Sequence, residues 1–69
     1  MSVTVKLNVP AISCNHCVAT IQRETKDLPG VEEVQADAAT KTATFVLKND
    51  AVLPLVKETL TDIGYPAAN

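Results

Sequence analysis

The spacing of apolar residues changes repeatedly along this chain, and the order of the changes restricts the fold more than any other feature. Residues 3–9 alternate apolar and polar side chains, as a strand with one buried face does. Residues 17–28 then repeat apolar side chains every three or four positions, which is typical of an amphipathic helix. Residues 31–38 and 42–47 return to a strand-like pattern, and residues 52–63 return to a helical one. The predicted order is therefore β-α-β-β-α.

Prolines, glycines and one acidic residue separate these segments. Pro10 ends the first strand because it has no N–H for the ladder, and Pro29 with Gly30 stops the first helix. Asp50 is the predicted N-cap of the second helix. Pro54 fits only in that helix's first turn, and Gly64 stands where a C-cap requires a left-handed residue.

Residues 65–69 can add at most a short last strand. The complete pattern βαββαβ is that of the α+β ferredoxin-like sandwich, in which two helices cover one face of an antiparallel sheet. The hairpin between the second and third strands is expected at residues 39–41. We predict one domain over residues 1–69, with the helical stripes packed on the apolar faces of the strands.

Size and charge exclude several functions. Six Lys and Arg stand against eight Asp and Glu, with one Phe and one Tyr, so the chain lacks the basic surface and aromatic platforms of nucleic-acid binding. No apolar run reaches the roughly 18 residues that cross a bilayer, so we expect no direct membrane insertion. The alternating N-terminus predicts a strand and not a signal peptide. A cytoplasmic protein is expected, and in that reducing compartment neighbouring cysteines more often bind metal or catalyse than staple a fold.

Cys14 and Cys17 are the only cysteines, and they lie where the strand pattern gives way to the helix pattern. They can close on one soft metal ion or on each other. A closed zinc site needs more ligands, and haem attachment needs a histidine after the second cysteine, where Val18 stands. A thioredoxin-like dithiol uses the same spacing, but in a longer chain with an aromatic-rich turn. Two buried structural cysteines do not fit a polar loop.

Metal chemistry suits this position best. Thiolates are soft ligands that select Cu(I), Zn²⁺ and iron–sulfur clusters. The N–H dipoles at a helix start favour negative charge and lower thiol pKa values. With two protein ligands, the best-suited ion is Cu(I), because this d¹⁰ ion accepts near-linear coordination by two sulfurs. An incoming thiolate can attack such an under-coordinated ion directly, which is the behaviour of a carrier.

Three motifs together resemble the heavy-metal-associated domain family, in particular its small bacterial and cyanobacterial copper chaperones. They are Cys14-x-x-Cys17 after the first strand, Pro29-Gly30-Val31 after the first helix and Gly64-Tyr65 after the second. The resemblance implies a non-enzymatic protein whose two cysteines hold Cu(I). It also implies delivery to the similar metal-binding domain of a copper-transporting P-type ATPase. We expect a monomer without metal and consider a copper-bridged homodimer.

Residues around the cysteines carry further expectations from this resemblance. Ile12 stands where the family usually has a methionine that tethers the loop, and it can pack in the same way. Ser13 stands where zinc- or lead-binding members often have aspartate, which favours copper. Tyr65 is expected beside the metal site, where its hydroxyl can donate to a thiolate or its ring can shield the ion. His16 is a further candidate ligand, but we expect it to face solvent or a partner.

Three alternatives remain open. The nearest is a carrier of Zn²⁺ or Hg²⁺ with the same fold. A second is a dithiol oxidoreductase, and a third is the metal-binding domain of an ATPase separated from a longer chain.

Overall fold

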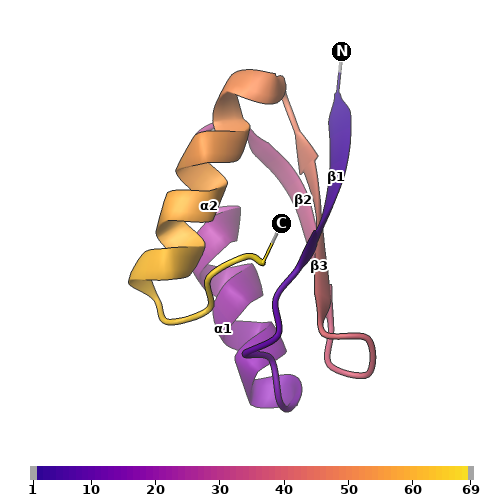
Figure 1. Cartoon of the computed structure of the whole chain (residues 1–69). Helices are drawn as coiled ribbons and strands as arrows, with labels where there is room; N and C mark the ends of the chain where they lie inside the picture. Colours follow the sequence, from indigo (N-terminus) through magenta and orange to yellow (C-terminus); the bar gives the residue numbers. More distant parts are fainter. Residues whose placement is uncertain (1, 69) are drawn as a thin grey trace.

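The computed structural model describes residues 2–68 and contains an antiparallel sheet with two helices on one of its faces (Figure 1). This arrangement confirms the predicted α+β architecture. The elements in chain order are β1 (Val3–Asn8), α1 (Asn15–Lys26), β2 (Val31–Asp37), β3 (Thr42–Leu47), the 3₁₀ turn η1 (Asp50–Val52) and α2 (Leu53–Asp62).

The sheet has the strand order β1-β3-β2, with β3 in the centre and antiparallel to both neighbours. Phe45 of β3 lies opposite Val5 of β1 and Val34 of β2, so the three side chains share the face that the helices cover. The register of β2 shifts between Val31 and Glu33. A bulge of this kind puts an extra residue into one strand. It explains why the apolar positions of β2 are spaced by three before they return to strict alternation.

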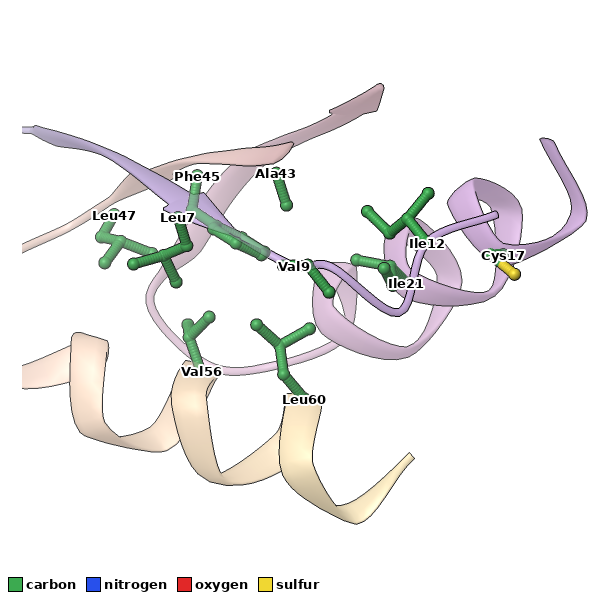
Figure 2. Close-up of a cluster of buried hydrophobic side chains, with 10 residues drawn as sticks. All are labelled: Leu7, Val9, Ile12, Cys17, Ile21, Ala43, Phe45, Leu47, Val56 and Leu60. Atoms are coloured by element: carbon green, nitrogen blue, oxygen red, sulfur yellow. The ribbon is translucent and has the colours of Figure 1, made fainter. Parts of the chain in front are cut away.

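The core lies between the sheet and the two helices (Figure 2). Each fully buried Val, Leu, Ile or Phe side chain contributes about 1.5–3 kcal/mol by its removal from water. The one fully buried hydroxyl, that of Thr25 in α1, donates to the Ile21 carbonyl at 2.6 Å and so is satisfied inside its own helix. The buried apolar residues are Leu7, Val9, Ile12, Cys17, Ile21, Ala43, Phe45, Leu47, Val56 and Leu60.

Both glycines have a positive φ, which the sequence predicts for Gly64 as the residue after the second helix. Gly64 follows α2 with φ +88°, and a Cβ there would meet nothing within 4 Å. Gly30 turns the chain into β2 with φ +92°, and a Cβ there would lie 2.5 Å from Cγ2 of Val52. Gly30 is therefore required both by its backbone conformation and by close packing against η1. Pro54 lies in the first turn of α2, as predicted.

The predicted last strand is reduced to one ladder contact among the described residues. Residues 65–68 form no strand, although the Ala68 N–H donates to the Asn8 carbonyl of β1 at 2.7 Å. Two physical reasons apply: Pro66 has no N–H to donate, and alanines at 67 and 68 have little tendency to form strands. Asn69 lies outside the described residues.

The predicted N-cap of the second helix, Asp50, is wrong. Asn49 caps the 3₁₀ turn η1, where its side-chain oxygen accepts from the Ala51 N–H at 3.0 Å, and the N-cap residue of α2 itself is Val52, which makes no side-chain capping bond. Asparagine and aspartate side chains can both cap a helix start, and neighbouring candidates cannot be ranked from sequence alone. The cap opens a 3₁₀ turn that leads directly into α2.

Candidate metal centre

The segment between β1 and α1, which carries Cys14, is held by two backbone hydrogen bonds and by one buried side chain. At the β1 end, the Val9 N–H donates to the Lys41 carbonyl at 2.8 Å, which ties the segment to the β2–β3 hairpin. The Ile12 N–H then donates to the Val9 carbonyl at 3.1 Å and closes a turn. The Ile12 side chain is fully buried and lies beside Ile21 of α1 (Figure 2). An apolar anchor therefore holds the loop immediately before the first cysteine.

Cys14 is the N-cap residue of α1. Its backbone is extended, with φ −161° and ψ 175°, and its carbonyl accepts from the N–H groups of Cys17 and Val18 at 3.1 and 3.3 Å. Its side chain makes no capping hydrogen bond and is exposed. Nothing in the sequence indicated this role, because cysteine is not among the usual N-cap residues. The sulfur is therefore held at the helix start by the backbone while remaining open to solvent.

The helix begins before the point at which its apolar stripe begins. Asn15 and His16 belong to the first turn of α1, and Cys17 is the first buried residue of that helix. The two cysteines are consequently the last residue before the helix and a residue in its first turn. This puts both sulfurs at the end of α1 where backbone N–H groups point outward and favour negative charge.

The two sulfurs lie 3.9 Å apart, and both cysteines are free thiols. They differ in exposure, since Cys14 is open to solvent and Cys17 is only 8% exposed. Cys17 lies at the edge of the core, where its sulfur marks the boundary between the apolar interior and the loop (Figure 2). One sulfur is thus accessible to another molecule and the other is anchored.

Four hydrogen bonds stabilise the thiolate of Cys17. The bond with the Tyr65 side chain is the largest influence, followed by a backbone and a side-chain hydrogen bond from Ser13 and a weaker one from the Cys14 side chain, and the pKa of Cys17 falls to about 6. The Ser13 hydroxyl lies 3.6 Å from the Cys17 sulfur. The same contact with Cys17, helped by desolvation, raises the pKa of Tyr65. Cys17 is therefore mostly ionised at neutral pH, and Tyr65 remains a hydrogen-bond donor.

The structure does not bring His16 into this cluster. Its side chain is exposed on the first turn of α1. Across residues 2–68, no three His, Cys, Asp or Glu side chains lie close enough together to hold a metal ion. The site offers two sulfur ligands from the described chain, surrounded by hydroxyl donors.

None of the described helices combines the length and the apolar character that crossing a membrane requires.

Comparisons with known proteins agree with this geometry. The heavy-metal-associated domain model matches residues 6–66, which include both cysteines and the Gly64-Tyr65 turn. The COP-associated protein of Helicobacter pylori strain J99 is 35% identical over 60 residues, which cover 87% of this chain and 91% of that protein. The periplasmic component of a mercuric transport protein from Pseudomonas aeruginosa is 34% identical over 67 residues, which cover 94% of this chain and 72% of that protein.

Solved structures extend the similarity to the fold. A candidate copper-ion-binding protein from Bacillus anthracis strain Ames superposes with a TM-score of 0.88 at 31% identity, over 97% of this chain and 96% of that one. The matched span, the identities and the superposition together show that the chain belongs to the heavy-metal-associated domain family.

Proposed function

We propose that this protein is a cytoplasmic Cu(I) carrier that binds its cargo through Cys14 and Cys17. The observation that supports this most directly is the pair of free sulfurs 3.9 Å apart, with no third His, Cys, Asp or Glu of the described chain beside them. Soft thiolates favour Cu(I), and a two-sulfur site meets this ion's needs without further protein ligands.

The number of ligands distinguishes the metals better than the distance between the sulfurs. Two metal–sulfur bonds of about 2.3 Å place the sulfurs about 3.8 Å apart at a tetrahedral angle and about 4.6 Å apart when linear. The observed 3.9 Å is close to the first value, and rotation of the exposed Cys14 side chain can supply the second. A tetrahedral Zn²⁺ ion would still need two ligands that the described chain does not provide, so its binding is expected to be far weaker.

The unequal exposure of the sulfurs suits transfer to another protein. An acceptor thiolate can approach a bound ion from the solvent-exposed side of the site, where Cys14 lies, while Cys17 stays anchored at the edge of the core. The proposed acceptor is the metal-binding domain of a copper-transporting P-type ATPase. Ligand exchange of this kind needs no refolding, because the loop is already held by Ile12 and by its backbone hydrogen bonds.

A dithiol oxidoreductase fits the site poorly. In such enzymes the attacking thiolate must be both ionised and accessible to a substrate disulfide. Here the lowered pKa belongs to Cys17, which is only 8% exposed. We therefore propose a carrier and not an enzyme.

A mercuric-ion carrier is the second candidate, favoured by the 34% identity to a periplasmic component of a mercuric transport protein. Hg²⁺ is also a soft d¹⁰ ion that accepts two thiolates, so binding strength in vitro does not separate it from Cu(I). The compartment and the cargo found in cells do separate the two functions.

Anaerobic titration of the reduced protein with Cu(I) and Zn²⁺, each in competition with a chelator of known affinity, tests the metal choice. We expect one Cu(I) per chain and a preference over Zn²⁺ of many orders of magnitude. Similar affinities for the two ions would overturn the copper assignment. The metal content of protein isolated from cells supplied with copper or with mercuric ion then decides between the two carriers.

A further inference from the structure

The sequence around the two cysteines carries no charged side chain. Residues 7–22 contain no Asp, Glu, Lys or Arg, whereas these four residue types make up 20% of the chain. Histidine counts as neutral at pH 7 in this comparison. Five residues of the stretch are exposed beside Cys14, and together with Cys14 they are called the uncharged face. They are Pro10, Ala11, Ser13, Asn15 and His16.

The fold places the uncharged face at one end of the molecule. Cys14 caps the start of α1, and the turn that follows α2 reaches the same end, where the Tyr65 side chain contacts Cys17 (Figure 1). Gly64 and Tyr65 of that turn are also uncharged. The charged residues of α1 lie in its second half, away from Cys14. They are Arg23, Glu24 and Lys26.

Charged residues occur only around the border of this end. Asp37 and Lys41 flank the β2–β3 hairpin, which is joined to the cysteine loop by the hydrogen bond from the Val9 N–H to the Lys41 carbonyl. Asp62 is the last residue of α2. These three exposed side chains bear both signs, and the chain has a formal net charge of only −2. Electrostatic steering requires a surface dominated by one sign, so this end of the molecule is poorly suited to it.

The transfer of a metal ion determines which surface the acceptor covers, and this step rests on the proposed carrier function. An incoming thiolate must approach a bound ion to about 2.3 Å, the usual length of a metal–sulfur bond. Ala11 precedes Cys14 by three residues, so their Cα atoms lie no more than about 11 Å apart. An acceptor whose sulfur reaches an ion on Cys14 therefore covers the uncharged face as well.

An uncharged face selects for an uncharged partner. A charge that is removed from water without a partner is strongly unfavourable, and the buried centres of protein interfaces are depleted in charged residues. A lysine or aspartate of the acceptor placed against Pro10 or Ala11 would find no opposite charge there. Small apolar and neutral polar side chains can cover the same residues without this cost.

We propose that this chain recognises its acceptor through the uncharged face, and that the acceptor surface around its own metal ligands is also uncharged. The one charge at the centre of the contact is then that of the site itself, a net −1 for Cu(I) held by two thiolates. Docking of this kind needs no steering, so the rate of transfer is nearly independent of ionic strength. A complex formed by opposite charges behaves differently, because its association slows steeply as salt is added.

Copper exchange between two copies of this chain tests the contact, since a second copy presents the same uncharged face. Unlabelled copper-loaded protein is mixed anaerobically with ¹⁵N-labelled reduced apo protein, and NMR measures the exchange rate. Sodium perchlorate is varied from about 10 mM to about 1 M, which shortens the Debye length from about 30 to about 3 Å. We expect the rate to change by less than about threefold, because the formal charge of each copy is only −2. A larger change overturns the proposal.

Charges added to the uncharged face provide the second test. Ala11→Glu in both copies should slow exchange by about two- to fivefold at low ionic strength, as expected for like charges about 5–10 Å apart in water. Ala11→Glu mixed with Ala11→Lys should exchange faster than the parent, and high salt should abolish both effects. Ala51→Glu is the matched control and should leave the rate nearly unchanged, because Ala51 is exposed in η1 at the opposite end of the molecule (Figure 1).

Cu(I) titration of the parent and of each variant separates the two levels of the argument. A parent protein that binds no Cu(I) refutes the carrier function. Variants that bind Cu(I) as the parent does, but exchange it equally fast with glutamate at position 11 or at position 51, refute the uncharged docking face alone.

Discussion

Replacing each cysteine by serine should remove metal binding in both cases but change stability in opposite directions. Cys14 is exposed and is the N-cap of α1, with an extended backbone and no capping bond from its side chain. Serine is among the best N-cap residues, because its oxygen accepts from an N–H of the first helical turn. Cys14→Ser should therefore stabilise the metal-free protein by about 0.5–1 kcal/mol.

Cys17→Ser should have the opposite effect. Its sulfur is part of the core, with 8% of the residue exposed. The change replaces apolar burial by a hydroxyl that only partly reaches the donors arranged around the larger sulfur. We expect a loss of about 1–2 kcal/mol. In a domain of this size, 1 kcal/mol moves the melting temperature by about 4–8 °C, so the two variants should be separated clearly.

Thermal unfolding of the reduced, metal-free proteins measures both effects, and anaerobic Cu(I) titration measures the loss of the site. Cys14→Ala is the matched control, because it removes the sulfur without adding a capping oxygen. The capping argument fails if the serine and alanine variants at position 14 melt together. The ligand assignment fails if either serine variant keeps tight one-to-one Cu(I) binding.

Three further predictions concern the thiolate, the turns and the loop anchor. The pKa of Cys17 is lowered from 9.0 to about 6 in the folded protein, so its thiolate contributes to the free energy of unfolding of the metal-free protein. This contribution should grow as the pH rises from about 6 to about 9 and should be lost as the pH falls through 6, which urea unfolding at a series of pH values measures. Tyr65→Phe should move the thiolate titration, followed by ultraviolet absorbance, back toward 9.0. Gly64→Ala should cost about 1–2 kcal/mol in urea unfolding from its positive φ alone, and Gly30→Ala should cost more because its Cβ also meets a side chain at 2.5 Å. Ile12→Ala should lower the free energy of unfolding by about 2–5 kcal/mol and weaken metal retention. Ile12→Met should lower it by less than about 1.5 kcal/mol and leave metal binding intact. Equal losses of stability and of metal binding in the two variants would refute the anchoring role.

The elements with clean periodicity could be predicted from the sequence. The central strand β3 alternates without interruption, and its Ala43, Phe45 and Leu47 are all buried as expected. Val31, Val34 and Ala36 were placed correctly in β2 even though their spacing is irregular, and the bulge near Glu33 supplies the reason. The prediction that Ala38 also belongs to this strand is wrong, because β2 ends at Asp37 and Ala38 lies in the turn that follows. The local spacing of apolar residues is enough to predict a helix or strand where one face of that element is buried along its whole length.

The remaining features depend on tertiary context that no local pattern contains. The predicted last strand does not form, because pairing with the edge of β1 depends on the backbone N–H groups and on the side-chain size of residues 66–68. Cys14 is the N-cap because α1 begins at Asn15. The apolar stripe begins only at Cys17, so it predicts a later start for the helix. The contact between Tyr65 and Cys17 joins opposite ends of the chain, so only the family resemblance suggested it.

The division between core and site explains how such a protein can work as a carrier. A carrier must keep its shape when empty, because transfer would otherwise require the acceptor to stabilise an unfolded loop. Within residues 2–68, nine of the ten buried apolar residues are not cysteines, and the exposed Cys14 is not part of that core. Cys17 belongs both to the core and to the proposed site, so in the proposed carrier it holds the bound metal in a fixed position, while the exposed Cys14 leaves a side open for exchange. Affinity and exchange rate can therefore be adjusted at the exposed positions of the loop with little effect on folding.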